Sequence, residues 1–371
     1  SGFSDLISLD MGGTSCDVAL VQGGTVARTV GGAVGGHPVA LPMVDIHTIG
    51  AGGGSLARLD PGGALAVGPE SAGADPGPAC YGRGGEEPTV TDAHLVLGHL
   101  LPEFPLGGLP ALDLDAARTA VRRIAEPLGL TVEEAALGIL DVADAAMERA
   151  IRVISVERGH DPRGFALLAF GGAGPLHAVP LARRLSIPKV LVPPTAGVLS
   201  ALGLLLAEVG HETSQGIVRP LRSLPVAELA ELLARLRERA GEELVGHGGP
   251  EEGLRFATVA ALRYAGQAHE LDIPVPQGRV GPQWVTELEE VFHKAHEQRY
   301  GHAAPGEEIE LVAVRVRASV PALPVDIRPS FSSAPELPAT GAAWFDRTGP
   351  VAARLVHRAD LGPGTRITGP A

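Results

Sequence analysis

The chain has few cysteines, few aromatic side chains and an excess of negative charge. Only two of its 371 residues are cysteines, Cys16 and Cys80, which excludes a disulfide framework and favours a reducing, cytoplasmic location. The formal net charge of −13 argues against nucleic acids and anionic membranes as general partners, because their phosphates repel such a surface. No apolar run is long enough to span a membrane, and residues 1–5 do not resemble the start of a secretory signal.

Glycine and proline, by contrast, are abundant, with 50 and 32 residues. They gather between apolar runs and not in low-complexity tracts, so disorder does not explain them. Glycine clusters that follow strands are places where a backbone can approach a ligand closely. We therefore look for the chemistry of this chain in those clusters.

The first third of the chain has a strand-rich beginning and then loses its periodicity. Three short apolar segments separated by glycine turns predict a β-meander, at residues 6–10, 17–21 and 25–30. From residue 31 to about 110 glycine and proline dominate, which indicates a long irregular insertion whose loops lie over a site.

Helical spacing returns at 113–125 and 131–157, where Asp144 alone interrupts an apolar stripe. The next segments alternate between strand and helix patterns and predict parallel strands covered by helices, at 165–170, 175–185, 189–192 and 197–207.

These patterns predict three regions. Residues 1–207 are expected to form an α/β half-domain with an insertion at about 31–130, and residues 208–320 an α+β domain. Residues 321–338 are rich in proline and serine and are interpreted as a linker. The remainder, to residue 371, is interpreted as the start of a truncated β-rich region.

The first candidate motif is Asp10-Met11-Gly12-Gly13-Thr14-Ser15, directly after a strand. Gly12 and Gly13 would let a phosphate approach the backbone, and the Thr14 hydroxyl adds a hydrogen-bond donor. A carboxylate at a strand end, such as that of Asp10, can hold hydrated Mg²⁺ against phosphates. The alternative is a tight hairpin turn that Asp10 merely caps.

The second motif, Gly171-Gly172-Ala173-Gly174, connects a buried strand to a helix. Such a loop places the N–H groups of a helix N-terminus at the edge of a sheet where nucleotides bind. One glycine loop is weak evidence, but two loops at strand ends of one domain favour nucleotide binding. His177, in the first turn of the helix, is interpreted as a partner in a structural hydrogen bond.

The insertion contains two Asp-x-His pairs, Asp45/His47 and Asp92/His94, whose members would face the same way in an extended strand. Together they could form an oxygen and nitrogen metal site, or each could be structural. Gly50–Ser55 between them could cradle an oxyanion or form a lid. Cys16 and Cys80 lack a basic neighbour in sequence that would favour a reactive thiolate.

Several motifs together resemble the central domain of the hydantoinase A/5-oxoprolinase family, over about residues 3–320. The resemblance rests on 10–18, 45–55, 75–82, 161–163, 170–178, 197–203, 263–267 and 300–302. It implies half of an actin-like or sugar-kinase-like ATPase fold, which is ribonuclease H-like, with the nucleotide in a cleft. The resemblance also implies that Asp10–Ser15 is the second phosphate motif and Gly171–Gly174 the adenosine motif. Because no first phosphate motif precedes Asp10, the chain is expected to be a fragment.

The resemblance further implies ATP-dependent hydrolysis of a cyclic amide, of the hydantoin or 5-oxoproline type, through phosphorylation of the lactam oxygen. Asp10 and Thr14 would be catalytic, and Asp10 would hold Mg²⁺ or another divalent metal, for which Asp45, His47 and Asp92 are further candidate ligands. The expected ATP contacts are Gly12, Gly13, Ser15, Gly171, Gly172 and Gly174. Cys16 and His94 depart from the family pattern, where Thr and Asn are usual.

The expected partners are a cyclic amide substrate and a hydantoinase B-like subunit or fused domain, in an oligomer. Two alternatives remain open. The chain could be an ATP-using subunit of an acetone- or acetophenone-carboxylase-type ligase, or a nucleotide-binding assembly module without catalysis, because fold resemblance does not fix the substrate.

Overall fold

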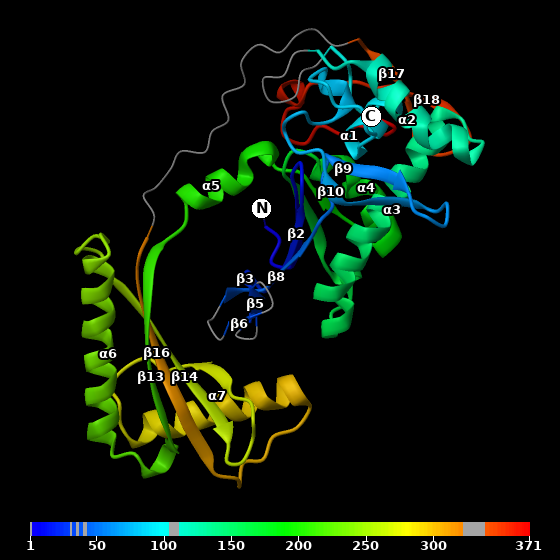
Figure 1. The fold of residues 1–371 in the computed structure, drawn as a ribbon. Coiled ribbons are helices and arrows are strands. Elements are labelled where there is room, and N and C mark those ends of the chain that lie inside the picture. The colour runs from blue at the N-terminus through cyan, green and yellow to red at the C-terminus, as the bar shows by residue number, and fades with distance from the viewer. Residues whose placement is uncertain (1, 30–31, 35–36, 40–42, 104–110, 322–337) are drawn as a thin grey trace. The chain divides into compact units, whose positions relative to one another are not determined.

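The computed structural model describes residues 2–29, 32–34, 37–39, 43–103, 111–321 and 338–371 (Figure 1). The chain divides into two compact units, Ser1–Ala201 with Ile327–Ala371 and Leu202–Asp326. Each unit has its own hydrophobic core. Among the described residues, no helix is long and apolar enough to cross a membrane.

A mixed sheet forms the centre of the first unit. Strand β1 pairs with β2 in the antiparallel sense and with β11 in the parallel sense. The described strands follow the order β12-β11-β1-β2-β3, and β8 also pairs with β2. Their bounds are β1 (Leu6–Met11), β2 (Cys16–Gln22), β3 (Thr25–Val26), β8 (Ile46–Ile49), β11 (Ala166–Phe170) and β12 (Val190–Leu191).

Helices α3 (Val132–Ile154) and α4 (Gly174–Leu185) pack on this sheet, α3 against β2 and β8 and α4 against β1, β11 and β12. Alternate residues of β1 are completely buried in the core, namely Ile7, Leu9 and Met11. Because side chains of a strand alternate between faces, Asp10 lies on the less buried face of the sheet. The α/β class expected for this region is confirmed.

The insertion is more regular than its sequence indicates. It contains the hairpin β9 (Ser55–Leu59) and β10 (Leu65–Ser71), helix α1 (Val90–Val96) and helix α2 (Leu114–Leu128). Only α2 had been expected, because all the residues of α1 are buried and show no amphipathic period. The expected strand at 25–30 is instead split into β3 and β4 (Arg28–Thr29), and β4 pairs with β7 (Met43–Val44). A further short pair is β5 (Gly32–Val34) with β6 (His37–Val39).

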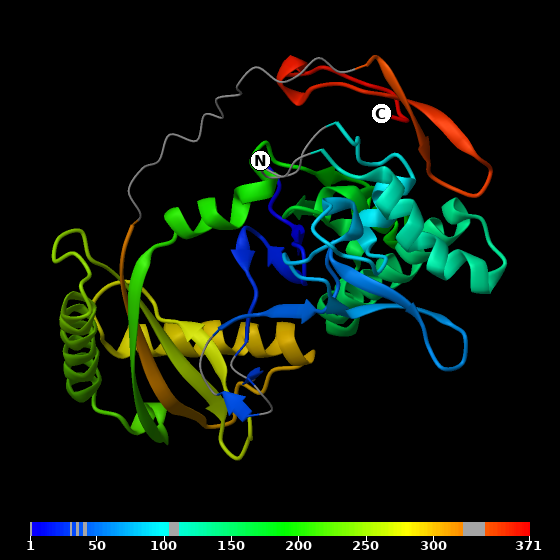
Figure 2. The same ribbon diagram turned by 45° about the horizontal axis from the view of Figure 1, so that its top comes forward.

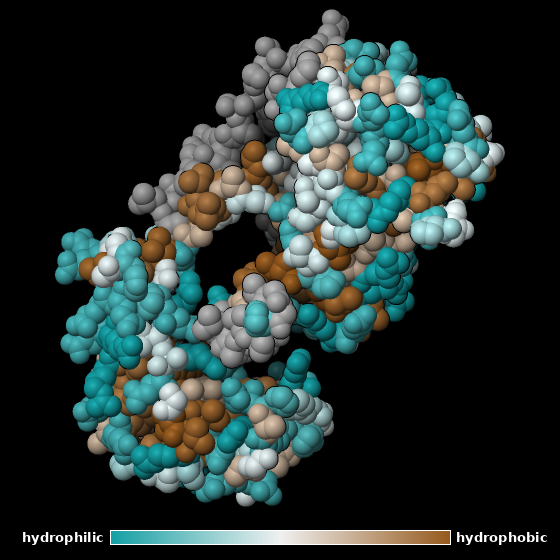
Figure 3. Space-filling view, viewed as in Figure 1, coloured by the Kyte–Doolittle hydropathy of each residue, from teal (hydrophilic) through white to brown (hydrophobic). Residues whose placement is uncertain are grey.

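The second unit consists of an antiparallel sheet and two helices, as the sequence predicts for an α+β region. The sheet order is β13-β16-β14-β15. Hydrophilic side chains cover the outer face of α6 (Figure 3), while its leucines enter the core. The bounds are β13 (Val209–Pro220), β14 (Arg255–Tyr264), β15 (Leu271–Pro274), β16 (Ile309–Val320), α6 (Val226–Gly246) and α7 (Pro282–Tyr300); the short helix α5 (Leu199–Leu205) precedes β13.

The chain returns to the first unit in a C-terminal hairpin, β17 (Thr340–Trp344) and β18 (Pro350–Arg354). Figure 2 shows this hairpin in orange and red. The backbone N–H of Trp344 donates to the Leu97 carbonyl at 2.9 Å, and the Ala342 carbonyl lies so close to Gly98 that a Cβ there would be 2.2 Å away. Most of the expected linker, residues 322–337, lies outside the described residues.

Candidate nucleotide site

The two glycine motifs lie side by side at one edge of the central sheet. Strands β1 and β11 are parallel, and Asp10 is in register with Phe170, so both strands end at the same edge. The Ala173 N–H donates to the Met11 carbonyl at 2.9 Å and ties the two loops together. A Cβ on Gly171, which has a φ of +83°, would lie 2.3 Å from that carbonyl oxygen. The two loops that the sequence places at strand ends therefore lie next to each other in the fold.

Asp10 is held from a third segment of the chain. The Ser200 hydroxyl donates to Oδ2 of Asp10 at 2.6 Å, and Oδ1 of Asp10 faces Gly171. The Gly12 N–H donates to the Ser15 carbonyl at 3.0 Å, so the turn closes without a cap from Asp10 at that position. The sequence analysis did not name Ser200 as a site residue, because its contact with Asp10 spans 190 positions and only its place in residues 197–203 drew attention to it.

The Gly50–Ser55 loop of the insertion braces the Gly12–Gly13 turn. The N–H groups of Gly53 and Gly54 donate to the carbonyls of Gly12 and Gly13 at 3.0 and 2.7 Å. A Cβ on Gly52 would lie 2.4 Å from the backbone nitrogen of Thr14. The loop therefore packs against the turn through backbone contacts that only glycine permits.

At three other positions of the two motifs, no contact within the protein requires a glycine. A Cβ on Gly12, Gly13 or Gly172 would meet no atom within 4 Å, and none of the three has a positive φ. Neither packing nor backbone conformation thus requires glycine at these positions. They leave an open approach to the backbone, which is the arrangement that a phosphate or a nucleoside needs. Thr14 is exposed beside this opening, with Oγ1 3.4 Å from Ser71 Oγ.

A second carboxylate lies next to Asp10. Asp17 is directly opposite Asp10 in the β1–β2 ladder, so both side chains are on the same face of the sheet. Asp17 accepts a hydrogen bond from the Thr48 hydroxyl. Two partly exposed carboxylates beside an open turn have the hard oxygen donors that Mg²⁺ prefers, so the residues present fit this ion. Asp17 was missed because the sequence does not give the cross-strand register.

Burial and these two carboxylates also act on Cys16. The thiol is completely buried, and burial, with Asp17 and Asp10 adding to it, raises the pKa of Cys16 to about 12. Burial beside Asp92 likewise raises the pKa of Cys80. Neither thiol therefore has the properties of a nucleophile.

The candidate metal ligands of the insertion do not converge. Asp45 forms an ion pair with Arg158, and His47 lies on β8 opposite Val18. Asp92 is completely buried and accepts hydrogen bonds from the backbone N–H groups of Ala79 and Cys80. Within the part of the chain that the structure describes, no three His, Cys, Asp or Glu side chains are grouped to hold a metal ion. We therefore do not assign Asp45, His47 and Asp92 as metal ligands.

Asp92 has a structural role at the start of α1. Its carboxylate accepts from the N–H and the hydroxyl of Thr89, at 2.9 and 2.8 Å, and the Thr89 hydroxyl caps the helix in return. The same carboxylate fixes the loop at Cys80. We predict that Asp92→Ala lowers the free energy of unfolding by about 3 kcal/mol or more, because several buried donors lose their acceptor. Chemical denaturation measures this; unchanged stability together with loss of a bound metal would return Asp92 to the metal ligands.

Comparison with known proteins shows the family of this chain. The Hydantoinase/oxoprolinase family matches residues 1–213. The chain is 40% identical over 317 residues to caprolactamase subunit alpha of Pseudomonas jessenii, which covers 84% of this chain and 45% of that protein. It is 35% identical over 334 residues to 5-oxoprolinase 1 of Arabidopsis thaliana, and this match covers 84% of the chain and 26% of that protein.

Two solved structures extend the likeness to the fold. The nucleotide-free structure of acetone carboxylase has a TM-score of 0.80 at 29% identity. The match covers 100% of this chain and 55% of the acetone carboxylase chain. The structure of the ATP-dependent caprolactamase of Pseudomonas jessenii has a TM-score of 0.72 at 36% identity, and the match covers 97% of this chain and 52% of the caprolactamase chain. The chain spans about half the length of these two structures. Because the family match covers more than half of the chain and these solved structures share its fold, the chain belongs to the hydantoinase/oxoprolinase family.

Proposed function

We propose that this chain supplies the second phosphate loop and the adenosine loop of an enzyme that hydrolyses a cyclic amide at the expense of ATP. The observation that carries the proposal is the open backbone at Gly12, Gly13 and Gly172, next to the Asp10 carboxylate. A nucleotide bound there would have its phosphates at the end of β1 and its nucleoside along the loop after β11.

Each residue would have a limited task. Gly12, Gly13 and Ser15 would contact phosphate oxygens, the Thr14 hydroxyl would donate to the transferring phosphoryl group, and Asp10 would hold hydrated Mg²⁺, with Asp17 beside it. Bound Mg²⁺ would neutralise phosphate charge. Gly171 and Gly174 would keep the second loop close to β1, because Cβ atoms there would approach Met11 and Leu9. Catalysis by this part would consist of positioning and electrostatic stabilisation.

The reaction we propose has two steps. The lactam oxygen attacks the γ-phosphorus of ATP, and the P–O bond to ADP breaks. In the hydrolytic step, water adds to the activated ring carbon and the ring C–N bond breaks with protonation of the nitrogen, which gives an acyl phosphate. A second water then adds to the acyl carbon, the C–O bond to the phosphoryl group breaks, and phosphate leaves the new carboxylate. Phosphorylation converts a poorly electrophilic amide into a centre with a good leaving group.

A carboxylase subunit is the second candidate. The acetone carboxylase structure covers the whole chain with the higher of the two TM-scores but at 29% identity, whereas caprolactamase subunit alpha is 40% identical to this chain. We place hydrolysis first on the sequence identity. Because caprolactamase subunit alpha is by name one of several subunits, we also propose that a hydantoinase B-like subunit or fused domain completes the enzyme in an oligomer.

The two candidates differ in what stimulates ATP consumption. We expect the complete enzyme with its partner to form ADP in step with ring opening of 5-oxoproline, a hydantoin or caprolactam. A lactam labelled with ¹⁸O in its carbonyl should pass the label to phosphate. ADP formation that requires bicarbonate and a ketone, with no response to any lactam, would favour the carboxylase.

The two classes of glycine give a prediction about binding. Gly12→Ala and Gly13→Ala should change the free energy of unfolding by about 0.5 kcal/mol or less, since the added methyl meets no atom of the protein. Both should weaken ATP binding by about tenfold or more, because the methyl occupies the phosphate approach. The matched control is Gly171→Ala, which should cost about 1–3 kcal/mol of stability from its positive φ alone.

Calorimetric titration with ATP and chemical denaturation, on the complete enzyme, measure both quantities. Normal ATP affinity in Gly12→Ala and Gly13→Ala would remove this turn from the nucleotide site. Strong destabilisation by either substitution would show that the glycine serves the fold.

Asp10 gives a prediction about catalysis. Asp10→Asn keeps the shape and the acceptor for Ser200 but removes the charge, so kcat should fall by about 100- to 10,000-fold. Ser200→Ala removes only one hydrogen bond to that carboxylate and should lower kcat by about 2- to 10-fold. Turnover and melting temperature are measured on the same preparations. Near-normal turnover of Asp10→Asn, with a lowered melting temperature, would mean that Asp10 is a structural residue.

A further inference from the structure

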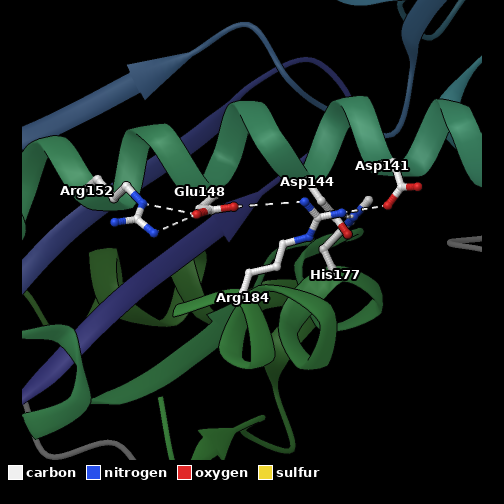
Figure 4. A network of polar contacts seen from close by, with 6 residues as sticks. All are labelled: Asp141, Asp144, Glu148, Arg152, His177 and Arg184. Atoms are coloured by element: carbon white, nitrogen blue, oxygen red, sulfur yellow. Dashed lines mark hydrogen bonds and ion pairs between the residues drawn. The ribbon is translucent and has the colours of Figure 1, made fainter. Parts of the chain in front are cut away.

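A line of buried polar side chains runs through the first unit, away from the nucleotide site. It begins at Asp144 on α3, whose Oδ1 lies 2.6 Å from Nδ1 of His177 on α4 (Figure 4). Nε2 of His177 lies 3.1 Å from Nε2 of His94 on α1. Asp144, His177 and His94 are only 4%, 1% and 2% exposed, so bulk water does not reach them.

The line continues to the C-terminal hairpin. Nδ1 of His94 lies 2.9 Å from Nδ1 of His99, and Nε2 of His99 lies 2.7 Å from the carbonyl oxygen of Trp344 on β17. The Phe345 ring stacks on His99, with 5.4 Å between ring centroids. Four consecutive hydrogen bonds therefore connect a carboxylate in the core with the backbone of the hairpin.

The Trp344 carbonyl fixes the direction of every bond in this line. A carbonyl oxygen can only accept, so His99 donates from Nε2. Burial lowers the pKa values of both His94 and His99, so each is neutral and has one N–H. His99 then accepts at Nδ1 from His94, and His94 accepts at Nε2 from His177.

The hydrogen bond between His177 and Asp144 requires one proton more than three neutral imidazole rings contain. His177 already donates from Nε2, so a proton between its Nδ1 and Asp144 must be additional to the neutral ring. That proton makes His177 an imidazolium beside a carboxylate, or protonates Asp144, and the line as a whole is uncharged in both cases. Four bonds need four protons, and the three neutral rings supply three.

We propose that the Asp144–His177–His94–His99 line is a relay, that is, a chain of hydrogen bonds in which each group has a fixed role as donor or acceptor. We further propose that its fourth proton helps to hold the C-terminal hairpin on the first unit. When this proton leaves, three protons remain for four bonds, and one bond must be lost. The hydrogen bond that is lost is the one between His99 and Trp344. Of the two ends of the line, only this one is half-buried, so its unpaired groups can form hydrogen bonds with water instead. Docking of the hairpin is therefore tightest with the proton bound and weakens as the pH rises.

The charged groups around the relay are already paired with one another. Arg184 on α4 contacts Asp141 at 2.6 Å and Glu148 at 3.9 Å, and Glu148 also binds Arg152 at 2.8 Å, as Figure 4 shows. On α1, the Asp92 carboxylate is occupied by Thr89 and Cys80. These contacts leave Asp144 as the carboxylate that shares a proton with His177.

The relay also reaches the candidate nucleotide site. His177 lies in the first turn of α4, which begins at Gly174 of the second glycine loop. The hairpin and this loop are thus attached to one hydrogen-bonded line. The order of the protons in this line does not depend on which reaction the complete enzyme catalyses.

Histidine tautomers test the direction of the relay. In ¹⁵N spectra of this chain, with resonances assigned through His94→Gln and His99→Gln, we expect His94 to carry its proton on Nδ1 and His99 on Nε2. The reverse pattern, or a fully protonated His94 at neutral pH, would overturn the proposal.

Amide exchange tests the effect on the hairpin. The Trp344 N–H donates to Leu97, so its protection factor reports docking, and the Leu167 N–H, which donates to Lys189, is a core reference. From about pH 6 to about pH 10 we expect the Trp344 protection factor to fall about 2- to 10-fold relative to that of Leu167, as for one lost hydrogen bond.

Asp144→Asn is the matched control, because its amide N–H donates permanently to Nδ1 of neutral His177 and replaces the fourth proton. This variant should keep Trp344 protected over the same pH range. Asp144→Leu supplies no donor and should lower stability relative to Asp144→Asn. Equal pH dependence in the wild type and Asp144→Asn, or no dependence in the wild type, would overturn the proposal.

Discussion

The parallel pairing of β1 with β11 is the constraint on which the candidate site depends. It brings together loops that are about 160 positions apart in the chain, because parallel neighbours end at the same edge of a sheet. The register places Asp10 opposite Phe170, and the backbone bond from Ala173 to Met11 then fixes the distance between the loops. Without this pairing, the two glycine motifs would be separate turns with no common ligand.

Glycine serves two different purposes around this edge. At Gly52 and Gly171 it permits backbone segments to approach more closely than any Cβ allows, and the scaffold depends on that approach. At Gly12, Gly13 and Gly172 the protein leaves the space above the backbone free. The first class builds a rigid edge and the second keeps it accessible, a division of roles that favours a phosphate-binding surface over an ordinary hairpin turn.

Sequence patterns predicted elements and local motifs better than partnerships. The meander, helix α3 and the second unit follow from periodicity and turn residues, and the two glycine loops follow from their places after strands. The Asp-x-His pairs misled because spacing gives a shared direction but not the partner, which for Asp92 is a set of buried backbone N–H groups. Asp144 was visible as a break in an apolar stripe, but its partner His177 lies 33 positions away. Ser200 and Asp17 likewise needed the fold to bring them to Asp10.

The central claim is that ATP binds against the edge formed by β1 and β11. A crystal structure of the complete enzyme with Mg²⁺ and a non-hydrolysable ATP analogue tests it most directly. The account predicts phosphate oxygens within about 3 Å of the Gly12–Ser15 turn, as hydrogen bonds require, with the metal beside Asp10 and the nucleoside along Gly171–Gly174. A nucleotide bound elsewhere, with the Gly12–Gly13 turn facing only water, would contradict it.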